Sequence, residues 1–147
     1  MLIDSHAHLD SERYAEDRAA MLARAWEAGI GTILAIGIGE HASGMDGALK
    51  VCREFNGQPN LPHLYSSAGV YPHNTPEADD AVLAKLDQLL AEPEVIACGE
   101  IGLDYYHEGA PHDIQREGLI RHARTVSLKR RQRINAGLSV AFISIDS

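Results

Sequence analysis

A histidine pair near the start of the chain is the feature best suited to chemistry. His6 and His8 are separated by one residue and follow Leu2-Ile3, which predicts a short strand. Because side chains alternate along a strand, the two imidazoles would point to the same side and could chelate one divalent ion. Asp4 and Asp10 are close enough in sequence to orient the rings. Two surface histidines also arise by chance, so this pair alone leaves metal binding open.

Two further polar segments follow later predicted strands. The segment Gly99–Tyr105 contains Glu100 and Asp104, and His73 follows the preceding predicted strand. Each residue has an ordinary structural interpretation, as a helix cap or a loop residue. Their shared position just past predicted parallel strands nevertheless favours one common rim. The three segments together indicate a metal-assisted hydrolase, in which an ion activates water and polarises a phosphoryl or carbonyl oxygen.

The elements that would position these residues alternate regularly along the chain. Apolar runs predict strands at 2–3, 32–38, 64–70 and 94–98, and amphipathic stretches predict helices at 12–28, 42–55, 75–90 and from about 113. The apolar run 32–38 is typical of a strand buried on both faces. Thr75-Pro76 is a favourable helix start. This order predicts a parallel α/β sheet, either doubly wound or part of a (β/α) barrel, and no glycine-rich phosphate loop supports the nucleotide-binding versions.

The bulk composition indicates an ordinary globular domain. The 147 residues are 45% hydrophobic and 23% charged, which suits one domain with its own core. No apolar run approaches the roughly 20 residues that cross a bilayer, and the first residues lack the features of a secretory signal. Two cysteines, Cys52 and Cys98, are too few for a disulfide framework. We therefore expect a cytoplasmic protein without a membrane partner.

The C-terminal part of the chain has a different charge. Residues 116–147 hold 7 of the 13 Lys and Arg residues but only 2 of the 21 Asp and Glu residues. A basic cluster at 129–133 is followed by the apolar run Leu138–Ile145. A basic segment of this kind can bind nucleic acid, and it can also be an exposed helix face or a tail of foreign composition.

The three polar segments together resemble the TatD family of metal-dependent deoxyribonucleases. Ile3–Asp10 is similar to the family's opening strand, Ala68–His73 to its third-strand motif and Gly99–Tyr105 to its fourth. The resemblance covers roughly residues 1–122. It implies the first half of a TIM-type (β/α)₈ barrel with about four βα units, followed at 123–147 by a divergent tail that is basic and then apolar.

The resemblance also implies an activity and a site. The family hydrolyses phosphodiester bonds in DNA at a centre that holds two divalent ions, with zinc, manganese and magnesium as candidates here. By correspondence, His6 and His8 match metal-ligating histidines. Glu100 matches the carboxylate that bridges the ions, and we take it as the catalytic residue. His73 matches a substrate-binding position, and Tyr71 stands where the family usually has a histidine.

Residues 123–147 contain no counterpart of the family's remaining ligands, two histidines and an aspartate. A frameshift or a gene-model error would explain this departure, and a short variant with a natural fifth strand is the alternative. With three ligands for one ion and Glu100 alone for a second, we expect weak metal binding and impaired nuclease activity. Four or five strands also leave two open sheet edges through which the chain could self-associate.

Two other functions stay open at this point. An amidohydrolase or phosphotriesterase-like metal hydrolase would share the early histidine pair, although the Gly99–Tyr105 segment argues against it. A non-enzymatic fragment with a nucleic-acid-binding tail would depend on the basic cluster instead.

Overall fold

The computed structural model describes the backbone of residues 1–135 and 141–146 and the side chains of residues 1–125. Five strands form one sheet: β1 (Leu2–Ala7), β2 (Ile30–Ala35), β3 (His63–Ala68), β4 (Val95–Leu103) and β5 (Ala141–Asp146). The helices are α1 (Arg18–Glu27), α2 (Gly47–Phe55), α3 (Asp80–Leu89) and α4 (His112–Asn135). Short 3₁₀ segments precede three of them: η1 (Glu12–Tyr14), η2 (Ala42–Gly44) and η3 (Pro72–Glu77).

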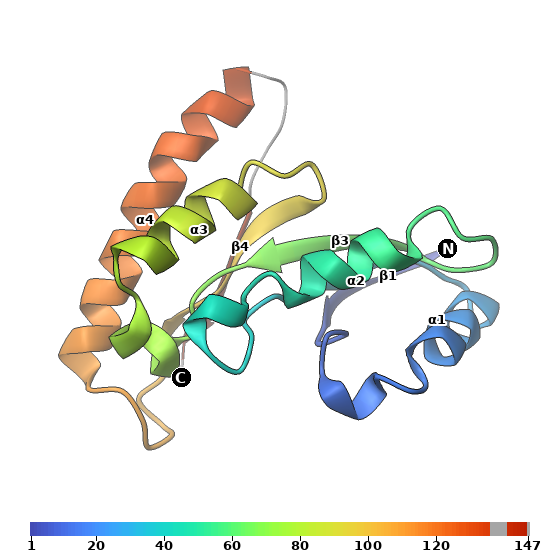
Figure 1. Cartoon of the computed structure of the whole chain (residues 1–147), viewed down its shortest axis with the longest axis horizontal. Helices are drawn as coiled ribbons and strands as arrows, with labels where there is room; N and C mark the ends of the chain where they lie inside the picture. Colours follow the sequence, from blue (N-terminus) through green and yellow to red (C-terminus); the bar gives the residue numbers. More distant parts are fainter. Residues whose placement is uncertain (136–140, 147) are drawn as a thin grey trace.

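The strand order identifies the type of sheet. The strands lie in the order β1-β2-β3-β4-β5, and every neighbouring pair is parallel. The colours of Figure 1 follow this progression across the molecule, from α1 at one end to α4 at the other. A doubly wound sheet reverses its strand order at a switch point, whereas this sheet advances in one direction. The arrangement is therefore that of consecutive βα units of a (β/α) barrel.

Burial of the strands differs from the expectation for β2. Along β2 buried residues alternate with half-buried ones, and β1 is exposed at most positions. The prediction that the strand at 32–38, which corresponds to β2, is buried on both faces was wrong. Helices pack on one face of the sheet, and nothing in the described residues fills the other face as the remaining strands of a closed barrel would.

Helix α3 begins later than predicted. Asp79 is its N-cap, and the Asp79 carboxylate accepts a hydrogen bond of 2.8 Å from the Val82 N–H. Thr75 lies in η3 instead, where its hydroxyl donates to the Pro72 carbonyl. An Asp side chain can cap an N-terminus as well as Thr, and the preceding proline-rich turn uses the Thr hydroxyl locally.

Strand β4 extends further than predicted. Its apolar first half was expected to end at residue 98, but the strand continues to Leu103. Pairing with β5 supports the extension, because Ile101, Gly102 and Leu103 each have a partner on that strand. Glu100 therefore lies inside β4, near its carboxyl end. The fifth strand overlaps the apolar run Leu138–Ile145 and ends one residue beyond it.

The predicted division between residues 122 and 123 falls inside α4, which is continuous from residue 112 to 135. This division stays a prediction about composition. The side chains of the basic cluster at 129–133 lie outside the described residues.

Two groups of buried apolar side chains hold the helices against the sheet. One group joins α1 and α2 to the first strands and includes Leu22, Ile33 and Phe55. The other joins α3 to β3 and β4 and includes Leu86 and Val95. Among the described residues, no helix has the length and apolar character needed to cross a membrane.

Candidate metal centre

The structure brings together three residues that were predicted from the sequence as metal ligands. His6 and His8 come from the carboxyl end of β1, and Glu100 comes from β4. Their ligand atoms all lie within 4.8 Å of one another. In a flat sheet, three strand spacings of about 4.8 Å each would hold β1 and β4 roughly 14 Å apart. The contact therefore depends on the curl of the sheet.

The geometry of the histidine pair suits a divalent ion. The Nε2 atoms of His6 and His8 face each other at 3.3 Å, and His6 Nε2 lies 4.0 Å from a Glu100 carboxylate oxygen. Metal–nitrogen distances of about 2.0–2.1 Å in a tetrahedral site give a nitrogen–nitrogen separation of about 3.4 Å. Two imidazoles and one carboxylate are also a common donor set for divalent metals. The residues present thus fit a single ion.

The neighbouring acids act differently from the expectation. Asp4 accepts a hydrogen bond of 3.0 Å from the backbone N–H of His6, and in the described structure neither Asp4 nor Asp10 hydrogen-bonds an imidazole. The short Asp4 side chain reaches the backbone two residues on more easily than the ring. Burial raises the pKa of Asp10. A cavity of about 690 Å³ borders His8 and Asp10.

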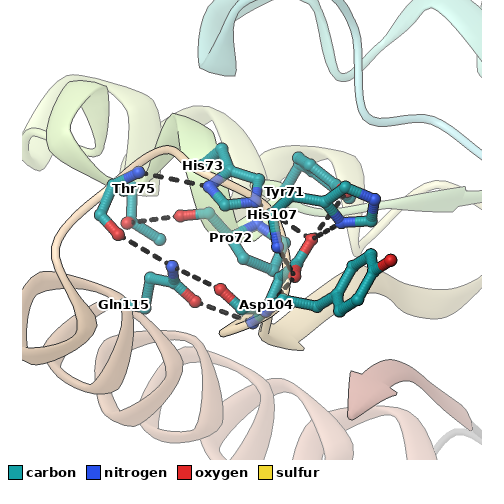
Figure 2. A network of polar contacts seen from close by, with 9 residues as sticks. Tyr71, Pro72, His73, Thr75, Asp104, His107 and Gln115 are labelled. Carbon is teal, nitrogen blue, oxygen red and sulfur yellow. Dashed lines mark hydrogen bonds and ion pairs between the residues drawn. The ribbon is translucent and has the colours of Figure 1, made fainter. Parts of the chain in front are cut away.

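A second cluster surrounds Asp104, directly after β4. His73 Nε2 and His107 Nδ1 lie 3.0 Å and 2.9 Å from the same carboxylate oxygen, as Figure 2 shows. The other oxygen accepts from the backbone N–H groups of Tyr106 and His107. The side chain of Asp104 is only 1% exposed. Hydrogen bonds from the His107 backbone, then from the two imidazoles and the Tyr106 backbone, hold the pKa of Asp104 well below its usual range.

Hydrogen bonding decides whether this second cluster could be a metal site. The Ala110 N–H donates to His73 Nδ1 at 3.1 Å. A neutral His73 must therefore carry its hydrogen on Nε2, from which it donates to Asp104. That nitrogen has no lone pair for a metal. The cluster is consequently a hydrogen-bonded network that fixes the β4–α4 loop (residues 104–111).

His73 belongs to this network and not to the predicted metal ligands. Both of its ring nitrogens are hydrogen-bonded, and a Cβ at Gly109 would lie 2.0 Å from His73 Nδ1. The ring is therefore packed tightly under the loop, and its contact with substrate stays a prediction.

Tyr71 links the two clusters. Its hydroxyl lies 3.5 Å from Asp104 Oδ2. Burial raises the pKa of Tyr71, and the negative charges of Asp104 and Glu100 both add to the increase. The phenol is therefore neutral at neutral pH and donates to the Asp104 carboxylate.

Two residues of the network were missed from the sequence. Gln115 is fully buried; its side-chain oxygen accepts from the Asp104 N–H, and its nitrogen donates to the carbonyls of Asp104 and Ala110. His107 stands three residues after Asp104, a spacing that suits a local hydrogen bond in a turn. The spacing from Asp104 could therefore have indicated that His107 belongs to the network. No sequence pattern indicated that Gln115 would be buried in it.

The fold and the site define the class: a (β/α) barrel-type protein with a candidate metal centre at the carboxyl ends of its strands. Residues 3–127 match the model of the family described as TatD related DNase. The chain belongs to this family.

Individual relatives agree with the family match. The chain is 38% identical over 108 residues to the 3′-5′ ssDNA/RNA exonuclease TatD of Salmonella typhimurium, covering 71% of this chain and 37% of that protein. It is 31% identical over 117 residues to the uncharacterized metal-dependent hydrolase YabD of Bacillus subtilis, covering 80% and 43%. The chain thus spans less than half the length of these relatives.

Solved structures show the same relationship in three dimensions. The TATD homolog YJJV from Escherichia coli superimposes with a TM-score of 0.75 and 27% identity, covering 97% of this chain and 50% of that one. A TatD family hydrolase from Entamoeba histolytica gives a TM-score of 0.73 and 26% identity, with 89% and 46% covered. The prediction of the first half of a TIM-type barrel is confirmed.

Proposed function

We propose that this protein is a metal-dependent hydrolase of phosphodiester bonds in DNA, with His6, His8 and Glu100 as its metal ligands. The observation that carries the proposal is the 3.3 Å approach of the two imidazole nitrogens beside the Glu100 carboxylate. Two imidazole nitrogens that face each other at this distance can share only one hydrogen, whereas a divalent ion between them would use a lone pair of each. The names of the relatives, a nuclease and a metal-dependent hydrolase, support the same chemistry.

Each residue has a definite part in this proposal. A divalent ion such as zinc, manganese or magnesium would supply Lewis-acid polarisation of a phosphoryl oxygen and would make a water molecule more acidic. His6 and His8 would hold that ion, and Glu100 would contribute a carboxylate ligand beside them. His73 supports the substrate side by holding Asp104 and the β4–α4 loop.

We further propose that metal binding and nuclease activity are weak in this chain. Within the described residues, this centre has three ligands, His6, His8 and Glu100, which suffice for one ion with open positions. Among the described residues of this centre, a second ion would find only Glu100. DNA is the proposed substrate, and RNA is the alternative because the name of the Salmonella relative includes both. Two buried free thiols, Cys52 and Cys98, suit the reducing cytoplasm where we place the protein.

Calorimetric titration with zinc and with manganese tests the site. We expect His6→Ala and His8→Ala to lower metal affinity at least about tenfold, since even changes behind a ligand cost 10–100-fold. His63→Ala is the matched control, because His63 is exposed at the amino end of β3, away from the site. Unchanged affinity in both variants would remove the proposed site.

Cleavage of labelled single strands tests the activity. We expect slow, chelator-sensitive cleavage of a DNA strand by the purified chain, and none by the His6→Ala variant. An RNA strand of the same sequence distinguishes the two substrates. Cleavage as fast as that of a full-length relative would contradict the proposed impairment. Hydrolysis of a cyclic amide but not of a phosphodiester would favour the amidohydrolase alternative.

A further inference from the structure

The β4–α4 loop presents exposed aromatic rings from a rigid base. Tyr106 is 81% exposed, and its ring meets that of His107 edge to face at 4.9 Å. Tyr105 is also exposed and stacks on His112 with ring centres 4.0 Å apart. An exposed ring is normally free to move. Here Gln115 and Asp104 hold the backbone that carries the rings, through the hydrogen-bond network drawn in Figure 2. The backbone that carries the rings is therefore fixed before a ligand binds, which lowers the entropy lost on binding.

His107 is held by one ring nitrogen only. Its Nδ1 donates to the buried Asp104 carboxylate, and its side chain is 66% exposed. In the part of the chain that the structure describes, nothing hydrogen-bonds to Nε2. The carboxylate thus fixes the direction of the ring and leaves Nε2 toward solvent. An imidazole that carries hydrogens on both nitrogens is a cation and a suitable donor to a phosphate oxygen.

The loop lies next to the candidate metal centre. Glu100 and Asp104 stand four residues apart at the carboxyl end of β4. Tyr71, whose hydroxyl lies 3.5 Å from Asp104 Oδ2, follows β3, the parallel neighbour of β4, so both clusters lie at the carboxyl ends of adjacent strands. A strand of nucleic acid whose phosphate is at the metal centre would place a neighbouring nucleotide near this loop.

We propose that the β4–α4 loop is a nucleotide subsite, in which His107 Nε2 contacts a phosphate oxygen and Tyr106 stacks on the base. The proposal rests on the nucleic-acid substrate that we infer for the metal centre. Asp104 is a positioning residue, because its buried carboxylate acts on the subsite through the hydrogen bond that orients the His107 ring. Base–aromatic stacking tolerates every base, so the subsite would bind without strong sequence preference.

Titration with thymidine monophosphate, thymidine and inorganic phosphate, followed by NMR of the histidine rings, tests the subsite. We expect the monophosphate to shift the His107 resonances and to leave both ring nitrogens protonated in the complex. His107→Asn keeps a donor near the position of Nδ1 but removes Nε2. It should weaken binding of the monophosphate about tenfold and leave thymidine unaffected. Tyr106→Ala should weaken the monophosphate and thymidine about fivefold or more.

His63→Asn is the matched control, because it removes an exposed imidazole at the opposite end of the strands. Equal affinities for His107→Asn, Tyr106→Ala and the control would overturn the subsite. Metal titration on the same samples separates the two proposals. Metal binding without a loop response removes the subsite alone, and a loop response without metal binding removes the metal centre alone.

Discussion

Asp104 illustrates how one buried carboxylate can organise a rim. It receives hydrogen bonds from His73, from His107 and from two backbone N–H groups, so donors from two separate segments meet at one side chain. A buried charge is tolerated only when it is satisfied in this way. The network also ties down the loop that follows β4, in which the Tyr106 and His107 side chains are exposed.

The depressed pKa of Asp104 predicts a pH effect on stability. Its folded-state pKa lies below 3.8, so the unfolded chain binds more protons in that range. The contribution of Asp104 is complete above pH 3.8 and is lost as the pH falls through the folded-state value. We expect Asp104→Asn to unfold at lower urea concentration at pH 7 and to show a smaller loss on acidification. Parallel pH curves for the two proteins would contradict this.

At the scale of the element, the start of α3 is set by a single side chain. The Asp79 carboxylate satisfies a backbone donor that would otherwise lack a partner in the first turn. We expect Asp79→Ala to lower the free energy of unfolding by about 1 kcal/mol, measured by urea denaturation. Asp79→Asn should be close to the unsubstituted chain, because Asn caps equally well. If Asn were as damaging as Ala, the charge and not the cap would be responsible.

Helix α4 is joined to β3 through a buried histidine. His122 Nδ1 donates to the Gly118 carbonyl at 2.7 Å, and Nε2 accepts from the Val70 N–H at 3.1 Å. The ring is therefore neutral, with both nitrogens used. Burial lowers the pKa of His122 from 6.5. A structural role thus accounts fully for this histidine.

The buried His122 predicts a second pH dependence of the free energy of unfolding, at a pH closer to neutral than that of Asp104. Because the folded-state pKa of His122 lies below 6.5, the unfolded state takes up a proton first as the pH falls. The free energy of unfolding should be highest above pH 6.5 and decline from there toward the folded-state pKa. We expect His122→Gln to flatten this part of the curve. Denaturation at intervals between pH 5 and 8 would measure it, and an unchanged slope would assign the effect to another group.

At the scale of the whole molecule, β1 and β5 are the two edge strands of the sheet that the described residues form. Leu2 and Ile3 on β1 are 64% and 74% exposed, which is unusual for a parallel strand. An exposed apolar edge is a template for pairing with another chain. The relatives of roughly twice this length have further chain that could cover the same strand.

We expect the purified chain to self-associate with increasing concentration, as measured by sedimentation velocity. The double variant Leu2→Lys/Ile3→Lys should shift the equilibrium toward monomer, because charged side chains block edge pairing. Ile120→Lys is a matched control, since Ile120 is an exposed apolar residue on α4. A single monomeric species at all concentrations, or the same shift in the control, would contradict edge pairing.

The sequence by itself determined the order of elements and the identity of the candidate ligands. Alternation of strands and helices, the spacing of His6 and His8, and the motif around Glu100 are local patterns, and local chemistry produces them. The start of α3 was not determined by the local sequence. Thr75 and Asp79 are both good helix caps, and the folded structure uses Asp79. The end of β4 likewise depended on its pairing with a strand about 40 residues later in the chain.

Only the tertiary structure decided which polar groups meet. The pairing of His73 with Asp104 spans 31 residues, and the contact of His6 with Glu100 requires the sheet to curl. The hydrogen bonds then distinguish two clusters of similar composition. The histidine pair with Glu100 is a candidate metal centre, and the Asp104 cluster fixes the β4–α4 loop. The physical reason is that the sequence specifies which hydrogen-bond donors and acceptors are present. Which of them pair, and which ring nitrogens keep a lone pair for a metal, depends on the neighbours that the fold brings close.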